Sequence, residues 1–174
     1  MQLTDHQWKL GRYSSESVHI LDECVRPMLR NSMSYSRSVG YLRKSHFNDI
    51  GLELLNFIES GGEARYLIGD PLEADVLRSC EEALVGDKER NFSEGVSAKL
   101  RQLLQQATQH RDSEDLPLML LQFLVSEDKL DVRLVLREQG MHHEKIRIAS
   151  DHVGNTLIAV GSDNDSSSAL SGVN

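Results

Sequence analysis

Two short motifs in the last third of the chain carry residue types suited to phosphate chemistry. They are His143-Glu144-Lys145 and Gly161-Ser162-Asp163-Asn164. An imidazole can attack phosphorus, an ammonium group can neutralise a non-bridging oxygen, and hydroxyl and amide groups can donate hydrogen bonds to the remaining oxygens. His143, Lys145, Ser162 and Asn164 are therefore candidate catalytic residues for the cleavage of a phosphodiester.

The two motifs are weak one by one and stronger as an ordered pair. For this composition, chance gives roughly 0.24 His-x-Lys matches and about 0.06 Gly-Ser-x-Asn matches. Their joint occurrence is on the order of one in a hundred. The pairing therefore points to a function rather than to an accident of composition.

A β-hairpin is expected to position these motifs. Residues 145–149 and 156–161 are apolar and β-branched, and the Gly154-Asn155 pair between them is typical of a turn. His143 and Lys145 are two residues apart, so in an extended chain their side chains share one face. Asp151 lies in the loop, where an orienting acid and a plain turn residue are equally good interpretations.

The rest of the chain alternates between the helical period and the strand period. Helices are expected at residues 15–29, at 47–58 before Gly61-Gly62, at 73–84, and twice within 94–125 with a break near 112–117. Further strands are expected at 34–42, 64–69 and 131–136. This order predicts a single α/β domain over residues 1–174, with a mixed β-sheet flanked by helices on both faces and the candidate catalytic hairpin at its C-terminal end.

The spacing of His143, Lys145, Asp151 and the Gly161–Asn164 motif resembles the HKD signature of the phospholipase D superfamily, although Asp151 comes one residue later than in the commonest spacing. The continuation through Ser166-Ser-Ser-Ala-Leu170 to Asn174 is similar to the phospholipase D-like nuclease domain at the N-terminus of bacterial DEAD/DEAH-type helicases of restriction and phage-defence systems. The stretches Val39-Gly-Tyr-Leu42 and Arg65-Tyr-Leu-Ile-Gly-Asp70 also resemble that branch.

This resemblance implies a phospholipase D-like fold and a DNA nuclease that needs no metal or other cofactor. It implies that His143 forms a phosphohistidine, that Lys145 and Asn164 hold the non-bridging oxygens, and that Ser162 assists. The family's active site uses two copies of the signature, and the chain has one, so a homodimer is expected to supply the second histidine. A helicase or ATPase partner is also implied, and we expect the sequence to be part of a longer protein.

Composition limits the alternatives. The formal charge of −8 and the pI of about 5.3 argue against a protein that coats nucleic acid, but they leave room for a local basic patch. They also favour a rival hypothesis, a catalytically inactive dimerisation or DNA-docking module. A lipid phosphodiesterase is a third candidate, disfavoured because the chain has no amphipathic membrane face. No apolar run approaches the ~20 residues of a membrane span, so a cytoplasmic protein without membrane contact is expected.

Several other residues invite a functional interpretation that ordinary structure explains better. His142 and His46 are expected to be ordinary surface or helix residues, and a metal site at His142, His143 and His152 lacks suitable spacing. Arg37, Arg43 and Lys44 could form a phosphate patch, although a solvated charged surface is the simpler interpretation. Cys24 and Cys80 are expected to be buried free thiols.

Overall fold

The computed structural model describes residues 2–9, 20–69, 116–135, 139 and 142–161. Within them, one five-stranded sheet has the order β3-β2-β1-β4-β5. Its strands are β1 Ser34–Val39, β2 Glu63–Ile68, β3 Leu130–Leu134, β4 Ile146–Ser150 and β5 Thr156–Val160. β1, β2 and β3 are parallel, whereas β4 runs antiparallel to both β1 and β5. The predicted α/β class, mixed sheet and C-terminal hairpin are confirmed.

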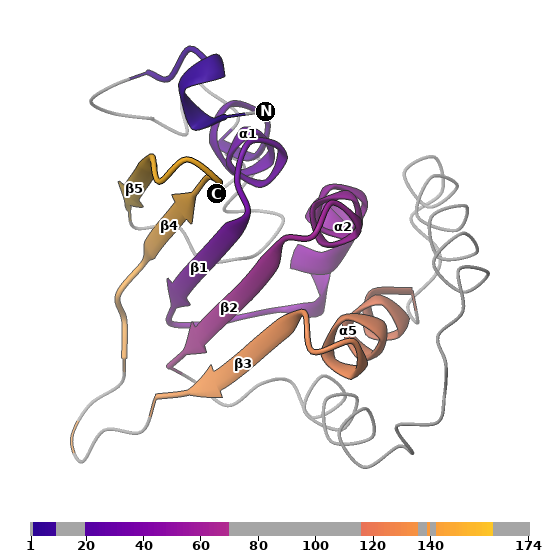
Figure 1. Cartoon of the computed structure of the whole chain (residues 1–174). Coiled ribbons are helices and arrows are strands. Elements are labelled where there is room, and N and C mark those ends of the chain that lie inside the picture. The colour runs from indigo at the N-terminus through magenta and orange to yellow at the C-terminus, as the bar shows by residue number, and fades with distance from the viewer. Residues whose placement is uncertain (1, 10–19, 70–115, 136–138, 140–141, 162–174) are drawn as a thin grey trace.

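In the described part of the chain, three α-helices cover one face of this sheet (Figure 1). They are α1 Arg26–Arg30, α2 Lys44–Glu59 and α5 Leu116–Ser126, and two short turns, η1 Leu3–Asp5 and η2 Leu21–Val25, precede them. α2 packs between α1 and α5. Helices on both faces were expected, but the described helices all lie on the same face. The helices expected within residues 70–115 lie outside the described residues.

The helices begin and end where local chemistry requires. α2 ends at Glu59, and Gly61 just after it has a φ of +89°, a left-handed conformation that glycine adopts without a steric penalty. Of the helix expected over 15–29, the part from Ile20 onward is described and is irregular, because Pro27 lacks the N–H that an α-helical hydrogen bond needs. The wide π turn η2 lies just before it, and the N–H of Arg26 donates to the carbonyl of Leu21.

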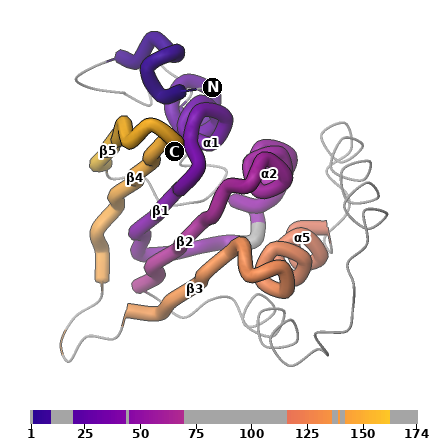
Figure 2. Tube along the Cα trace, in the orientation of Figure 1, coloured from indigo at the N-terminus to yellow at the C-terminus, as the bar shows by residue number. Residues whose placement is uncertain are grey.

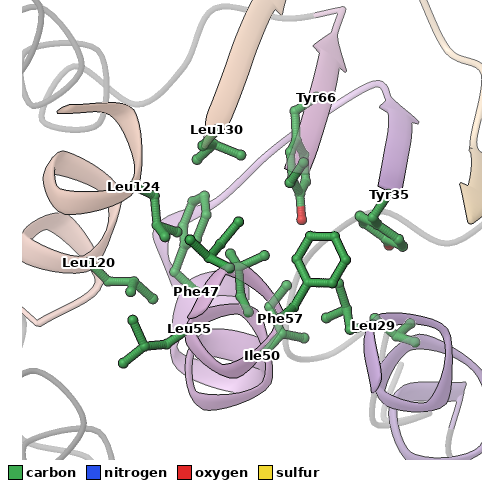
Figure 3. Close-up of a cluster of buried hydrophobic side chains, with 14 of the residues drawn as sticks. Leu29, Tyr35, Phe47, Ile50, Leu55, Phe57, Tyr66, Leu120, Leu124 and Leu130 are labelled. Carbon is green, nitrogen blue, oxygen red and sulfur yellow. The ribbon is translucent and has the colours of Figure 1, made fainter. Parts of the chain in front are cut away.

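The hydrophobic core lies between the helices and the alternate strand residues that face them. In β1 these are Tyr35, Arg37 and Val39, and in β2 they are Ala64, Tyr66 and Ile68. Figure 3 shows side chains from all three helices meeting this row of the sheet. The labelled members are Leu29, Tyr35, Phe47, Ile50, Leu55, Phe57, Tyr66, Leu120, Leu124 and Leu130. On the opposite face of the hairpin, Ile148, Ile158 and Val160 are exposed.

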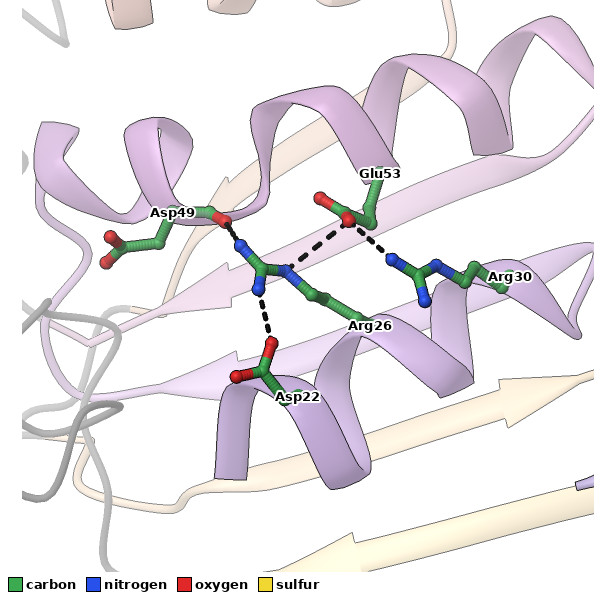
Figure 4. Close-up of polar contacts among 5 residues, drawn as sticks. All are labelled: Asp22, Arg26, Arg30, Asp49 and Glu53. Atoms are coloured by element: carbon green, nitrogen blue, oxygen red, sulfur yellow. Dashed lines mark hydrogen bonds and ion pairs between the residues drawn. The ribbon is translucent and has the colours of Figure 1, made fainter. Parts of the chain in front are cut away.

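Polar contacts join α1 to α2 at the edge of this core (Figure 4). The Glu53 carboxylate accepts a hydrogen bond of 2.8 Å from Nη2 of Arg30 and lies 3.4 Å from Nε of Arg26. Arg26 also donates to the carbonyl of Asp49 and forms an ion pair with Asp22. Cys24 is buried, as expected, forms no disulfide in the described part of the chain, and its Sγ lies 3.8 Å from Sδ of Met28. Cys80 lies outside the described residues.

Candidate active site

His143 and Lys145 lie side by side just before β4. Nζ of Lys145 is 2.9 Å from Nδ1 of His143 and 2.8 Å from the carbonyl oxygen of the same residue. Lys145 is only 4% exposed, whereas the His143 ring is exposed and meets the ring of Tyr41 edge-on. Both residues lie just before β4, which begins one residue later than expected, at Ile146, so their side chains meet outside the strand in which they were expected to share a face.

The contact between the two side chains restricts the protonation state of the imidazole. An ammonium group has only donors, so a protonated Lys145 makes Nδ1 of His143 an acceptor. The proton of the neutral ring then sits on Nε2, so this nitrogen has no free lone pair. For Nε2 to act as a nucleophile, the proton must move to Nδ1, which requires the ammonium to leave that atom. A phosphate oxygen that takes up the ammonium would permit this change.

The site lies at the carboxyl edge of the parallel strands. β4 is antiparallel to β1, so the start of β4 is beside the end of β1. Open α/β sheets usually bind ligands at this edge. Gly161 follows β5, and its N–H donates to the carbonyl of Lys145 at 3.0 Å. The hairpin therefore brings the first residue of the Gly-Ser-x-Asn motif beside Lys145, while Ser162 and Asn164 lie outside the described residues.

Asp151 lies at the other end of β4. The strand has five residues, which is about 17 Å of chain, so this carboxylate does not share a site with His143 and Lys145. It accepts hydrogen bonds from the backbone N–H groups of Leu3, Val153 and Asn155 and from the side chain of Asn155. Of the two interpretations open for Asp151, the geometry favours the turn residue.

The electrostatics of Asp151 agree with that structural role. Burial by itself would raise the pKa of this carboxyl, but the hydrogen bonds from the Asn155 side chain and from the three backbone N–H groups lower the pKa to about 2. The hydrogen bond from the N–H of Leu3 to Asp151 joins the N-terminal segment to the hairpin turn. Figure 2 shows this segment beside the same end of the hairpin. His152 is in the same turn, too far away to share a metal ion with His142 and His143.

The expectation that Arg37 is a surface residue is wrong. Arg37 is 1% exposed and lies in the row of β1 that faces the helices. It is directly opposite Arg147 of β4, which is 2% exposed. The strand alternation places Arg37 between Tyr35 and Val39, and this pattern could have predicted its burial. Arg37 therefore cannot belong to a surface phosphate patch with Arg43, which is exposed.

His142 is not the surface residue that was expected, and His46 is a helix residue, as expected, but a buried one. His142 is buried, and its Nε2 lies 2.6 Å from Oγ of Ser38 in β1. His46, in α2, is fully buried, and its Nε2 lies 3.0 Å from the hydroxyl of Tyr66. Neither partner belongs to a sequence motif. Only the placement of β1 against β4, and of α2 on β2, identifies these contacts.

No protein-family model matches the chain, and no curated protein matches it in sequence. Among the described helices, none combines the length and apolar character that crossing a membrane requires. The geometry of the site and the two motifs are therefore what point to its function.

Proposed function

We propose that the chain is a phosphodiesterase that cleaves DNA without a metal ion, through a phosphohistidine formed on His143. The observation that carries the proposal is the contact between the buried ammonium of Lys145 and the exposed ring of His143, 2.9 Å apart at the carboxyl edge of the sheet. This arrangement offers a nucleophile to solvent and holds a positive charge where a non-bridging oxygen would bind.

In the proposed reaction, Nε2 of His143 attacks the phosphorus atom, and the bond from phosphorus to the leaving oxygen breaks. A second histidine, His143 of the partner subunit in its imidazolium form, donates a proton to that oxygen and becomes a neutral imidazole. The same imidazole then accepts a proton from a water molecule as the water attacks the phosphohistidine, which restores both rings. Lys145, with Ser162 and Asn164 from the second motif, stabilises the charge on the non-bridging oxygens.

The biological setting is proposed from the resemblance to the phospholipase D-like nuclease domains of defence helicases. On this basis the substrate is DNA, the working form is a homodimer, and a helicase or ATPase domain or subunit delivers the DNA. The setting is a bacterial restriction or phage-defence system in the cytoplasm. The phospholipase D-like fold itself is part of this proposal. The mixed sheet with a site at the carboxyl edge of its parallel strands is compatible with it.

The second candidate is a catalytically inactive module that dimerises or docks onto DNA. Two observations favour it: the formal charge is −8, and Asp163 and Asp165 stand on either side of Asn164. Carboxylates beside a phosphate site repel the substrate unless they are themselves neutralised. This candidate predicts binding without cleavage.

The test is an incubation with single-stranded and double-stranded DNA in excess EDTA, with the wild-type protein and His143→Ala side by side. The proposal predicts cleavage that survives chelation and is lost in His143→Ala. A mass increase on the protein, preserved in alkali and lost in acid, would identify the phosphohistidine. His152→Ala is the matched control, because His152 is an exposed histidine in the distant turn.

Each other outcome identifies a different function. Binding of DNA without cleavage would support the docking module. Hydrolysis of a lipid phosphodiester with DNA left intact would support a lipid phosphodiesterase. A protein that stays strictly monomeric in solution while cleaving DNA would contradict the shared two-histidine site.

A further inference from the structure

Two residues contact the chain just before His143. Oγ of Ser38 lies 2.6 Å from Nε2 of His142. Gly69 approaches the His142 backbone so closely that a Cβ on Gly69 would lie 2.7 Å from the Cβ of His142 and closer still to its carbonyl oxygen. Real Cβ atoms essentially never make contacts this short. Only glycine at position 69 therefore allows this path of the chain.

Both holding residues belong to the parallel part of the sheet. Ser38 is in β1, and Gly69 follows β2, with its N–H donating to the carbonyl of Val39 at 3.0 Å. The segment that leads into β4 thus lies against the ends of two strands that come more than seventy residues earlier in the sequence. Its path is set by the sheet and not by local propensity.

The position of His142 affects the position of the candidate catalytic pair, His143 and Lys145. His143 is the next residue, and Nζ of Lys145 binds the carbonyl of His143 as well as its ring. Moving His142 therefore moves the carbonyl and the ring that Lys145 contacts. A displacement of about 1 Å at a catalytic group can cost on the order of a hundredfold in rate.

We propose that His142, held by Ser38 and Gly69, is a positioning residue that fixes the His143–Lys145 pair for attack on the phosphodiester. This inference rests on the proposed function for its kinetic consequence, but the positioning itself is a statement about geometry. Ser38, His142 and Gly69 do not contact the substrate in this scheme. They fix the position of His142 and thereby the position of the His143 backbone.

The experiment compares Ser38→Ala, Ser38→Thr and Gly69→Ala with the wild-type protein. Ser36→Ala is the matched control. Ser36 lies in β1 two residues before Ser38, and its partner in register is Ile148, in the middle of β4. The measurements are kcat and KM for DNA cleavage in EDTA, the unfolding midpoint, and the ¹⁵N chemical shifts of the His142 and His143 rings.

We expect Ser38→Ala and Gly69→Ala to lower kcat about tenfold or more, with KM little changed. We expect Ser38→Thr, which keeps the hydroxyl, to restore most of the rate, and Ser36→Ala to behave as the wild type. The ¹⁵N shifts of His143 should move in Ser38→Ala and Gly69→Ala and not in Ser36→Ala.

The two proposals fail in different ways. If the wild-type protein cleaves no phosphodiester, the proposed function is overturned, and the His143 shifts still test the positioning. If Ser38→Ala and Gly69→Ala fold with unchanged His143 shifts and unchanged kcat, the positioning is overturned and the proposed function stands. A loss in Ser38→Thr as large as that in Ser38→Ala would also contradict the role of the hydroxyl.

Discussion

Lys145 contacts His143 at two atoms at once, with its Nζ 2.8 Å from the carbonyl oxygen and 2.9 Å from Nδ1. These contacts position the ammonium beside the imidazole, where it can bind a phosphate oxygen. In the same geometry it keeps the ring in the form that carries its proton on Nε2. Substrate binding and activation of the nucleophile are thus expected to be coupled through this one amine.

Replacing Lys145 with Met should lower kcat for DNA cleavage by about a hundredfold to a thousandfold, because one donor to the charged oxygens is lost. The ¹⁵N shifts of His143 should also change, because Nδ1 loses its donor. Steady-state kinetics in EDTA and NMR of the histidine rings measure these effects. Lys129→Met is the control, as Lys129 is a surface lysine paired with Glu63. Equal rates in the two variants would remove Lys145 from the mechanism.

Replacing Asp151 with Asn should destabilise the protein at neutral pH. The kcat of the folded protein should not change, because the candidate catalytic pair lies at the other end of β4. Its hydrogen bonds lower the folded-state pKa from 3.8 to about 2 against the opposing effect of burial. The stabilisation by the carboxylate is therefore fully present above about pH 4 and is lost as the pH falls toward 2. Denaturant unfolding at a series of pH values should show the gap between wild type and variant closing over that window.

Asp131→Asn is the comparison for this experiment. The pKa of Asp131 is also lowered, chiefly by its hydrogen bond to Arg133, but Asp131 is at an exposed ion pair. Exposed pairs contribute little to stability. A gap for Asp151→Asn that is no larger than that for Asp131→Asn, or one that persists unchanged at pH 2, would contradict the assigned role of Asp151.

Replacing Glu53 with Ala should lower the free energy of unfolding by about 1.5–3 kcal/mol, the range for hydrogen bonds to charged groups. The Glu53 side chain is 10% exposed, and its loss leaves Arg26 and Arg30 without the carboxylate that ties α1 to α2. Urea unfolding measures the change. Glu63→Ala removes a carboxylate that is 72% exposed and 3.6 Å from Lys129, and it should cost less than about 1 kcal/mol. Equal losses of stability in Glu53→Ala and Glu63→Ala would mean that the polar contacts of Glu53 with α1 do not stabilise the fold.

Replacing Leu120 with Ala should cost about 2–5 kcal/mol, because the truncation leaves a cavity where α5 packs against α2. The neighbouring residue on α5, Met119, is 45% exposed, and Met119→Ala should change stability by less than about 0.5 kcal/mol. Both variants keep the helix propensity of the segment nearly constant. Similar losses in the two variants would show that α5 does not pack as described.

Local pattern in the sequence predicted much of the architecture. The order of helices and strands along the chain, the end of α2 just before Gly61 and the hairpin of β4 and β5 follow from residue periodicity and turn chemistry, which act over a few residues. The closeness of His143 and Lys145 follows in part from their spacing in sequence, but both lie before β4, and only the structure shows that one is exposed and the other buried.

The tertiary structure decided what depends on contacts between distant segments. It moved Asp151 away from the site, because a carboxylate at one end of β4 cannot reach residues at the other. It buried Arg37 opposite Arg147, through the pairing of β1 with β4. It brought His142 into contact with Ser38 and Gly69, and neither residue belongs to a motif that would have predicted this contact. The sequence alone determined which groups stand near one another along the chain, whereas burial and long-range pairing were settled only when the sheet brought segments a hundred residues apart into contact.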